Sequence, residues 1–263
     1  MQLGETNNKQ IVGELVINLY ADNSLDTRFM HYDNLVRSIG FDAVCYSFIP
    51  RASLQDSVKR PPIFKASKQF PQDFMERYQK DDFYNKDFTI REIKAGNLSP
   101  KNWKTYEQSS DLGDQELKVI RVAREEYGIE NALSIPTMNQ QIGIAGASLI
   151  SVKNDHDYQD MLHRHQQTLV NCTRIFNDII MQNASSDIVH TFVFTTLPKI
   201  TPKQRLVLRE LLRGTLQNNI GLELDMTQSA VDNHLANLRE AFEVKKTHDL
   251  KHLLETLNIM DYL

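Results

Sequence analysis

The most constraining feature of this 263-residue chain is a set of sharply marked helix ends in its last quarter. Thr201 is a good N-cap, Pro202 follows at the first helical position, and Gln204 stands where a capping box needs it. Gly214 marks a left-handed helix end, and Thr227 repeats the N-cap signal ahead of a further amphipathic segment. Short helices with ends this well marked predict a compact, all-helical unit.

We place this unit at residues 200–263, and its apolar spacing predicts four helices, at 202–213, 216–225, 228–242 and 247–257. The second and third helices, joined by a tight turn, are expected to form a helix-turn-helix that presents the third helix to the major groove of double-stranded DNA. The residues assigned to DNA contact are Gln228, Ser229, Asp232, Asn233, Asn237, Lys203 and Arg239.

Charge sets a limit on this interpretation. Basic and acidic residues are balanced in number within the unit, and phosphate neutralisation supplies most non-specific affinity for DNA. A single copy is therefore expected to bind weakly, and a homodimer that contacts two half-sites is the natural remedy. The alternative is a four-helix packing module that does not touch DNA.

The segment also resembles the DNA-binding domain of LuxR-type quorum-sensing transcription factors. The residues that match the family pattern are Ile200, Thr201, Val207, Leu208, Gly214, Ile220, Thr227, Val231, His234 and Asn237. Gln204 replaces a usual glutamate, and Gln228 and Ser229 replace the acidic and basic pair that opens the recognition helix. The resemblance implies the helix-turn-helix fold and leaves the operator sequence open.

Upstream, residues 1–182 alternate between helical and extended patterns, and residues 183–199 are expected to form a linker. Helices are predicted at 11–20, 25–38, 71–84, 114–127 and 158–181, and strands at 42–49, 62–64, 133–136 and 142–152. The order predicts an α+β fold: an α-β-α sandwich around a mainly antiparallel sheet. The strongly apolar face of the last helix serves either this core or a homodimer partner.

Aromatic residues gather in one stretch of this first domain, around a single aspartate: Phe70, Phe74, Tyr78, Tyr84 and Trp103, with Asp87 among them. An aromatic-lined cavity with one buried acceptor is a plausible small-molecule site. The alternative, which residue physics alone favours, is that the aromatic residues fill a core and the aspartate caps a helix or faces water.

The same stretch resembles the autoinducer-binding domain of LuxR-type receptors, through Phe70-Pro71, Phe74, Tyr78, Asp87, Trp103, Tyr127-Gly128-Ile129 and Ile135-Pro136. In that family the aspartate accepts a hydrogen bond from the amide N–H of an acyl-homoserine lactone, and the tyrosine reaches the acyl carbonyl. The resemblance implies a ligand pocket made of Phe70, Phe74, Tyr78, Asp87, Thr89 and Trp103, to which we add Cys45 and Ser47.

One departure bears on the ligand. Phe74 stands where the family has a tryptophan that donates to the lactone carbonyl, and phenylalanine has no donor. An unpaired buried carbonyl costs about 1–3 kcal/mol, so the ligand is either a lactone held differently or another small amphiphile.

Composition and motifs bound the remaining possibilities. With 41% hydrophobic residues, 24% charged residues and a net charge of −4, the chain is typical of a cytoplasmic globular protein without membrane affinity. Cys45 and Cys172 have no metal-ligand spacing and are expected to be buried free thiols in a reducing compartment. Without a phosphate loop, a nucleophile elbow or a metal cluster, we expect no cofactor and no enzymatic activity.

Two functions follow from these patterns. The first is a ligand-responsive DNA-binding regulator of the quorum-sensing type. The alternative is a ligand-independent regulator, or an interaction protein that pairs with another regulator and titrates it.

Overall fold

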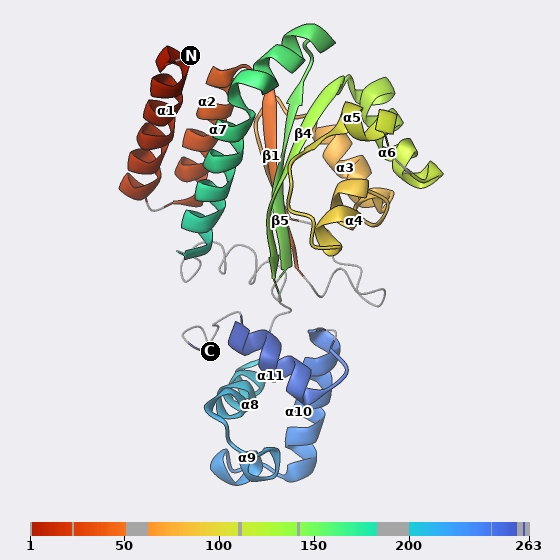
Figure 1. Cartoon of the computed structure of the whole chain (residues 1–263). Helices are drawn as coiled ribbons and strands as arrows, with labels where there is room; N and C mark the ends of the chain where they lie inside the picture. The colour runs from red at the N-terminus through yellow and green to blue at the C-terminus, as the bar shows by residue number, and fades with distance from the viewer. Residues whose placement is uncertain are drawn as a thin grey trace. The chain divides into compact units, whose positions relative to one another are not determined.

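The computed structural model describes residues 2–22, 24–50, 63–109, 112–140, 143–182, 200–242, 244–256 and 260. They fall into two compact units, one before and one after residues 183–199 (Figure 1). Residues 183–199, which the sequence predicts to be a linker, lie outside the described residues. No helix among the described residues is long and apolar enough to cross a bilayer.

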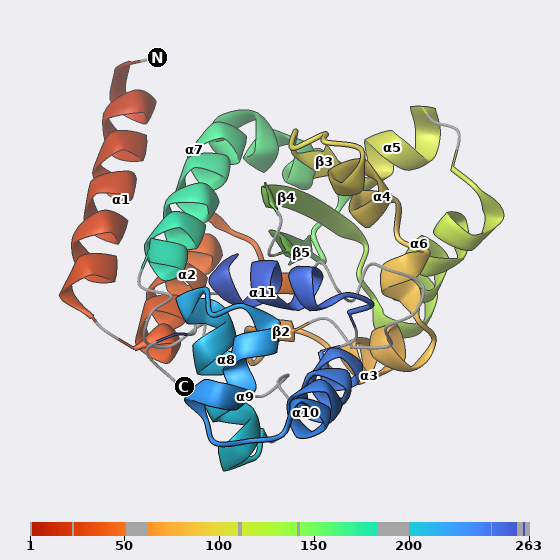
Figure 2. The same cartoon turned by 90° about the horizontal axis from the view of Figure 1, so that it is seen from below.

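The first unit has three layers with a sheet in the middle (Figure 1). Helices α2 (Leu25–Ile39) and α7 (Asp155–Gln182) cover one face, and α1 (Gln2–Ala21) packs against these two helices at the outer edge (Figure 2). Helices α3 (Gln72–Lys80), α4 (Phe88–Lys94), α5 (Trp103–Ser109) and α6 (Asp114–Tyr127) lie on the other. This arrangement confirms the predicted α-β-α sandwich.

The sheet has the strand order β2-β1-β5-β4-β3, and every neighbouring pair is antiparallel. Its strands are β1 (Ala43–Pro50), β2 (Ile63–Ala66), β3 (Lys101–Asn102), β4 (Asn131–Gln140) and β5 (Gly143–Ser151). Because successive side chains of a strand point to opposite faces, β1 and β5 each serve the α7 side and the α3 side alternately.

The apolar face of α7, which the sequence leaves open to core or partner, is core. Its buried residues include Leu162, Leu169, Val170, Phe176 and Ile179. The ring of Phe176 stacks on that of Tyr32 from α2 with centroids 4.6 Å apart. This apolar face is therefore not available to a homodimer partner.

The structure corrects the helix predicted at residues 71–84. Helix α3 ends at Lys80, Asp82 takes a left-handed conformation with φ 59°, and a 3-10 helix follows at Phe83–Asn85. Aspartate tolerates this conformation better than most residues, so the chain reverses there. The short elements β3, α4 and α5 were not predicted from the sequence, because two to seven residues carry too little periodicity.

The second unit contains α8 (Pro202–Arg213), α9 (Gln217–Glu223), α10 (Gln228–Ala241) and α11 (Thr247–Thr256) around one small apolar core. The predicted capping box is confirmed, since the Thr201 hydroxyl accepts from the Gln204 N–H and the Gln204 side chain accepts from the Thr201 N–H. Gly214 has φ 90°, which confirms the predicted helix end.

The turn between α9 and α10 is tight. A Cβ atom at Gly221 would lie 2.7 Å from the carbonyl oxygen of Met226, so only glycine fits there. The Met226 N–H donates to the Gly221 carbonyl at 2.8 Å, and Asp225 is left-handed with φ 50°. These contacts hold α10 at a defined angle to α9.

Candidate functional site

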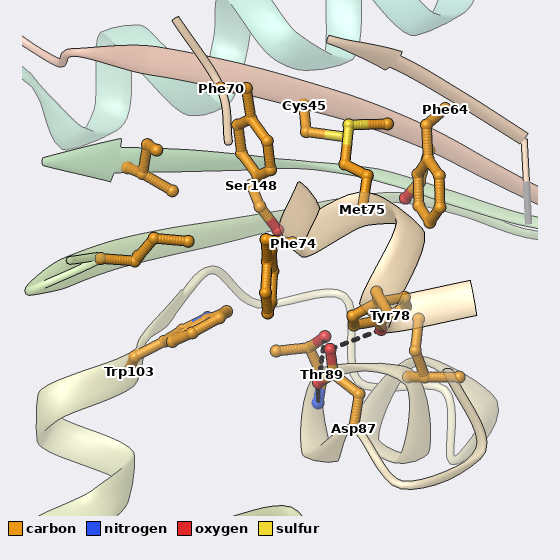
Figure 3. A pocket seen from close by; sticks show the side chains of 14 residues that line it. Cys45, Phe64, Phe70, Phe74, Met75, Tyr78, Asp87, Thr89, Trp103 and Ser148 are labelled. Carbon is orange, nitrogen blue, oxygen red and sulfur yellow. Dashed lines mark hydrogen bonds between the residues drawn. The ribbon is translucent and has the colours of Figure 1, made fainter. Parts of the chain in front are cut away.

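A pocket lies between the sheet and the helices on the α3 side of the first unit (Figure 3). All the residues assigned to ligand contact from the sequence line it: Cys45, Ser47, Phe70, Phe74, Tyr78, Asp87, Thr89 and Trp103. Sequence reasoning missed Phe64, Met75, Ile90, Ile129, Ser148 and Ile150, which line it as well. Tyr84, the other aromatic residue of the predicted cluster, is buried without lining the pocket.

Two elementary periodicities bring the lining residues together. On β1 and β5, the alternation of side chains places Cys45, Ser47 and Ser148 on one face, and Cys45 pairs with Ser148 in the register. On α3, Phe74 and Tyr78 are four residues apart and share the inward face. Side-chain alternation along the strand predicted at 142–152 could have shown that Ser148 and Ile150 share the face that lines the pocket.

The polar centre of the pocket is the carboxylate of Asp87. The Tyr78 hydroxyl donates to its Oδ2 at 2.7 Å, and the N–H and hydroxyl of Thr89 donate to its Oδ1, each at 2.7 Å (Figure 3). Burial raises the pKa of this carboxyl, and the hydrogen bonds from Thr89 and Tyr78 partly oppose that rise. Burial and the neighbouring carboxylate raise the pKa of Tyr78, which therefore keeps its proton and donates.

Asp87 thus has both of the roles that were predicted as alternatives: it caps a helix and it lines the pocket. It is the N-cap of α4, since its side chain accepts the Thr89 N–H. It is also 7% exposed and faces the pocket. Three donors from its own chain already satisfy it, and any ligand donor joins or replaces one of them.

A second polar group sits across the pocket. The indole N–H of Trp103 donates to Ser134 Oγ at 2.9 Å, and Ser134 Oγ lies 3.3 Å from Ser148 Oγ. The only tryptophan of the chain therefore uses its N–H donor in a hydrogen bond within the protein. Phe74, packed against Tyr78 and Tyr127, offers the ligand an aromatic surface without a donor.

Side chains fill most of the pocket. The space open to the centre of a water molecule is about 60 Å³. One water needs about 10–15 Å³ on this measure, and small-molecule pockets typically span about 300–1,000 Å³. An amphiphile with an acyl chain therefore fits only if lining side chains move, and Met75, which is flexible and half-buried, is suited to that.

A wider groove lies on the opposite side of the unit, between α1 and α2. It holds about 300 Å³ and is lined by Ile11, Glu14, Leu15, Asn18, His31, Asn34, Leu35 and Ser38. It is open to solvent, whereas the pocket around Asp87 is walled by aromatic side chains and contains a buried carboxylate. The latter has the character of a ligand site.

The residues assigned to DNA lie in the second unit. Gln228, Ser229, Asp232, Asn233 and Asn237 are exposed on α10, and Lys203 is exposed on α8. Arg239 is half-buried, and its guanidinium donates to the Thr247 hydroxyl at 2.9 Å.

Asp232 has partners that the sequence did not reveal. Its Oδ1 accepts from the side-chain amides of Gln217 and Gln228, both at 2.9 Å, so one carboxylate joins α9 to α10. Gln217 was missed because it belongs to a different helix and no periodic signal marks it. The bond also uses one of the two N–H donors of the Gln228 amide, which leaves the other N–H and the carbonyl oxygen.

Residues 24–179 match the family model of the autoinducer binding domain. The fold is similar to SdiA in complex with octanoyl-rac-glycerol, with TM-score 0.55 and 13% identity over 93% of each chain. Escherichia coli SdiA in another crystal form has TM-score 0.53 and 13% identity over 95% of this chain and 97% of its own.

A third similar structure is CepR2 from Burkholderia cenocepacia, an N-acylhomoserine lactone dependent LuxR family transcription factor. Its TM-score is 0.53 and its identity 14%, over 68% of this chain and 99% of its own. No curated protein sequence matches the chain. The matched family and structures are signal receptors and regulators rather than enzymes.

Proposed function

The chain belongs to the autoinducer binding domain family, and from that premise we propose that it is a ligand-responsive, DNA-binding transcriptional regulator of the LuxR type. The observation that carries the proposal is the aromatic pocket around the buried Asp87–Tyr78 pair, which lies within the matched residues. Residues 1–182 sense the ligand, residues 200–263 bind DNA, and residues 183–199 join them. The regulator acts as a homodimer in the cytoplasm.

The ligand we propose is an acyl-homoserine lactone or a related small amphiphile. Asp87 and Thr89 supply polar groups for the head, and Phe70, Phe74 and Trp103 supply an apolar wall for the chain. Because Phe74 lacks an N–H, a lactone ring carbonyl has no donor from that position. The octanoylglycerol bound by SdiA indicates a second head-group class, which brings hydroxyl donors of its own to an acceptor such as Asp87.

Ligand binding acts by mass action. A ligand that binds only the folded state stabilises it by about 2.7 kcal/mol at a concentration of 100 times Kd. Since side chains must move to admit the ligand, binding also selects one arrangement of the pocket. Operator occupancy then follows the population of that arrangement.

The test of the sensing step is thermal unfolding of the full chain against acyl-homoserine lactones of graded chain length and against monooctanoylglycerol. At least one is expected to raise Tm, and Asp87→Ala is expected to abolish the rise while remaining folded. Phe74→Trp is expected to strengthen lactone binding by restoring an N–H donor. If no ligand of the panel changes the Tm of the wild type, and the wild type folds and binds DNA without additives, the sensing role is rejected.

The test of the DNA step is selection from a random DNA pool, followed by gel shifts at increasing salt. Asn233 is suited to adenine, so Asn233→Ala is expected to relax the selected motif. Lys203→Ala is expected to weaken all sequences alike and to reduce the salt dependence. An unchanged motif in Asn233→Ala contradicts the assignment of that residue.

The second candidate function is an interaction protein that pairs with another regulator. The exposed carboxylate of Asp232 favours it, since a negative charge on the proposed DNA-reading face repels phosphate. A complete absence of gel shift at low salt, with and without bacterial culture extract, supports this alternative over the first.

A further inference from the structure

Most hydrogen-bond donors of the pocket are already used within the protein. The lining side chains whose hydroxyl, thiol or indole N–H donates to another group of the chain are Cys45, Ser47, Tyr78, Thr89 and Trp103. Ser148 is the remaining lining residue with a side-chain donor. Whether a donor is left for a ligand therefore depends on which way the hydrogen bond between Ser148 and Ser134 runs.

The direction of the hydrogen-bond chain through Trp103, Ser134 and Ser148 is fixed at its first link. An indole N–H can only donate, so Ser134 Oγ accepts from Trp103 at 2.9 Å. Ser134 is 5% exposed and has one proton of its own, and Ser148 Oγ lies 3.3 Å away. If Ser148 donated instead, the buried proton of Ser134 would lose this acceptor, which is unfavourable. Ser134 therefore donates to Ser148, and Ser148 keeps its own proton.

The remaining proton of Ser148 belongs to the pocket. In β5, whose residues are all described, Ser148 is the only residue that is half-buried rather than buried. Because β5 lies between β1 and β4 in the sheet, this opening is toward the pocket that Ser148 lines. Figure 3 shows Ser148 on the sheet side of the pocket and Asp87 on the helix side, with the ring of Phe74 between them. The pocket thus has a donor on one side and an acceptor on the other.

We propose that Ser134 is a positioning residue: held by Trp103, it directs the hydroxyl of Ser148 into the pocket as the donor to a carbonyl group of the ligand. The proposal rests on the ligand-sensing function proposed above. It specifies the ligand as an amphiphile that has a hydroxyl or N–H for Asp87 and a carbonyl for Ser148. Ser134 does not line the pocket and acts through Ser148.

The need for such a donor follows from Phe74. A carbonyl group that is buried with its ligand must be paired, and the ring of Phe74 cannot pair it. Ser148 carries the proton that the other lining side chains lack, so it compensates for the donor missing at Phe74. The 3.3 Å between the two serine oxygens is longer than the usual distance of about 2.7–2.8 Å. Orientation by Ser134 is therefore expected to contribute less than the hydroxyl of Ser148 itself.

The first experiment compares two probes that differ by one carbonyl, monooctanoylglycerol and the ether 1-O-octylglycerol. Binding to the full chain is followed by the fluorescence of Trp103, its only tryptophan. Ser148→Ala is expected to weaken binding of the ester about tenfold, because a buried carbonyl loses its donor. Binding of the ether is expected to change less than about twofold. N-octanoyl-homoserine lactone, which also has carbonyl groups, is expected to follow the ester.

The second experiment tests the positioning role. Ser134→Ala is expected to weaken binding of the ester about threefold and to spare the ether, and Ser134→Thr, which keeps a hydroxyl, is expected to restore the affinity. Thr137→Val is the matched control. It removes a hydroxyl from the same strand, where Thr137 donates to Asn177 of α7. This control is expected to keep the wild-type ratio of ester to ether affinity, whatever its effect on Tm.

A measurement without ligand separates positioning from general damage. Ser134→Ala removes the acceptor of the Trp103 N–H, so the Trp103 emission is expected to shift to shorter wavelength, whereas Ser148→Ala leaves this acceptor in place. If Ser134→Ala does not fold, Ser134→Cys, whose thiol is a weaker donor and acceptor, is expected to show both changes in part.

The outcomes distinguish this proposal from the sensing role. Equal losses for ester and ether in Ser148→Ala, or a wild-type ratio of the two affinities in Ser134→Ala, overturn the proposal and leave the sensing role standing. A wild type that binds none of the three probes overturns the sensing role and this assignment together.

Discussion

Two aspartates, Asp87 in the pocket and Asp232 on α10, make similar contacts in opposite environments. Each accepts hydrogen bonds from side chains of its own chain: Asp87 from Tyr78 and Thr89, and Asp232 from Gln217 and Gln228. Asp87 is 7% exposed, and burial raises its pKa, whereas Asp232 is exposed to solvent.

The difference shows how burial changes what the hydrogen bonds of each carboxylate contribute to stability. In the pocket, the carboxylate of Asp87 is buried, so the loss of one of its hydrogen bonds is expected to affect folding as well as ligand binding. On α10, water competes for the same contacts, so the network of Asp232 contributes little to stability and chiefly orients side chains. Four substitutions probe this contrast.

The largest effect is expected from Asp87→Ala. It removes the N-cap of α4 and leaves the Tyr78 and Thr89 hydroxyls without an acceptor in a buried site. Loss of these contacts, partly offset by removal of a buried charge, is expected to destabilise the protein by about 2–3 kcal/mol. Urea unfolding measures the change, and a cost below about 0.5 kcal/mol would show that the network is not structural.

Tyr78→Phe is expected to cost about 1 kcal/mol, since it removes one of the three donors to Asp87 and keeps the aromatic packing against Phe74 and Phe83. The same substitution removes the hydroxyl at the position whose tyrosine reaches the acyl carbonyl in LuxR-type receptors. Ligand titration of the variant separates the two roles: a stability cost with unchanged ligand affinity limits Tyr78 to holding Asp87.

A smaller effect is expected from pH. Burial raises the folded-state pKa of Asp87 above its ordinary value of about 3.9, so folding favours the protonated carboxyl. The resulting gain in folding stability is complete below that value and is lost as pH rises through the folded pKa. Asparagine does not ionise. Asp87→Asn is therefore expected to gain stability relative to the wild type between about pH 4 and pH 7, measured by thermal unfolding. A difference that stays constant or reverses over this range contradicts the buried charge.

The smallest effect on stability, within about 0.5 kcal/mol, is expected from Asp232→Ala, because the site is exposed. Its effect on DNA should be larger. Gln228 loses the acceptor that holds its side-chain amide, so the selected motif is expected to change at the base that Gln228 contacts. A large loss of Tm would remove the contrast between the two aspartates.

Local signals made much of the fold predictable. The capping residues Thr201 and Gln204 and the terminal Gly214 act through contacts within four residues, so their geometry could be read directly from the sequence. The alternation of β1 and β5 and the spacing on α3 likewise predict which side chains share a face. The predicted helix at 71–84 was too long, because hydrophobic periodicity does not reveal that Asp82 is left-handed.

The sequence by itself determined both ends of α8, the strand faces and the clustering of aromatic residues around one aspartate. Only the tertiary structure decided that Asp87 both caps a helix and lines the pocket, and that Gln217 binds Asp232. It also decided that the apolar face of α7 is core while Ile17 of α1 remains exposed. The physical reason is that caps and periodicity depend on neighbours along the chain. Burial and the partner of a side chain depend instead on which distant elements the fold brings against it.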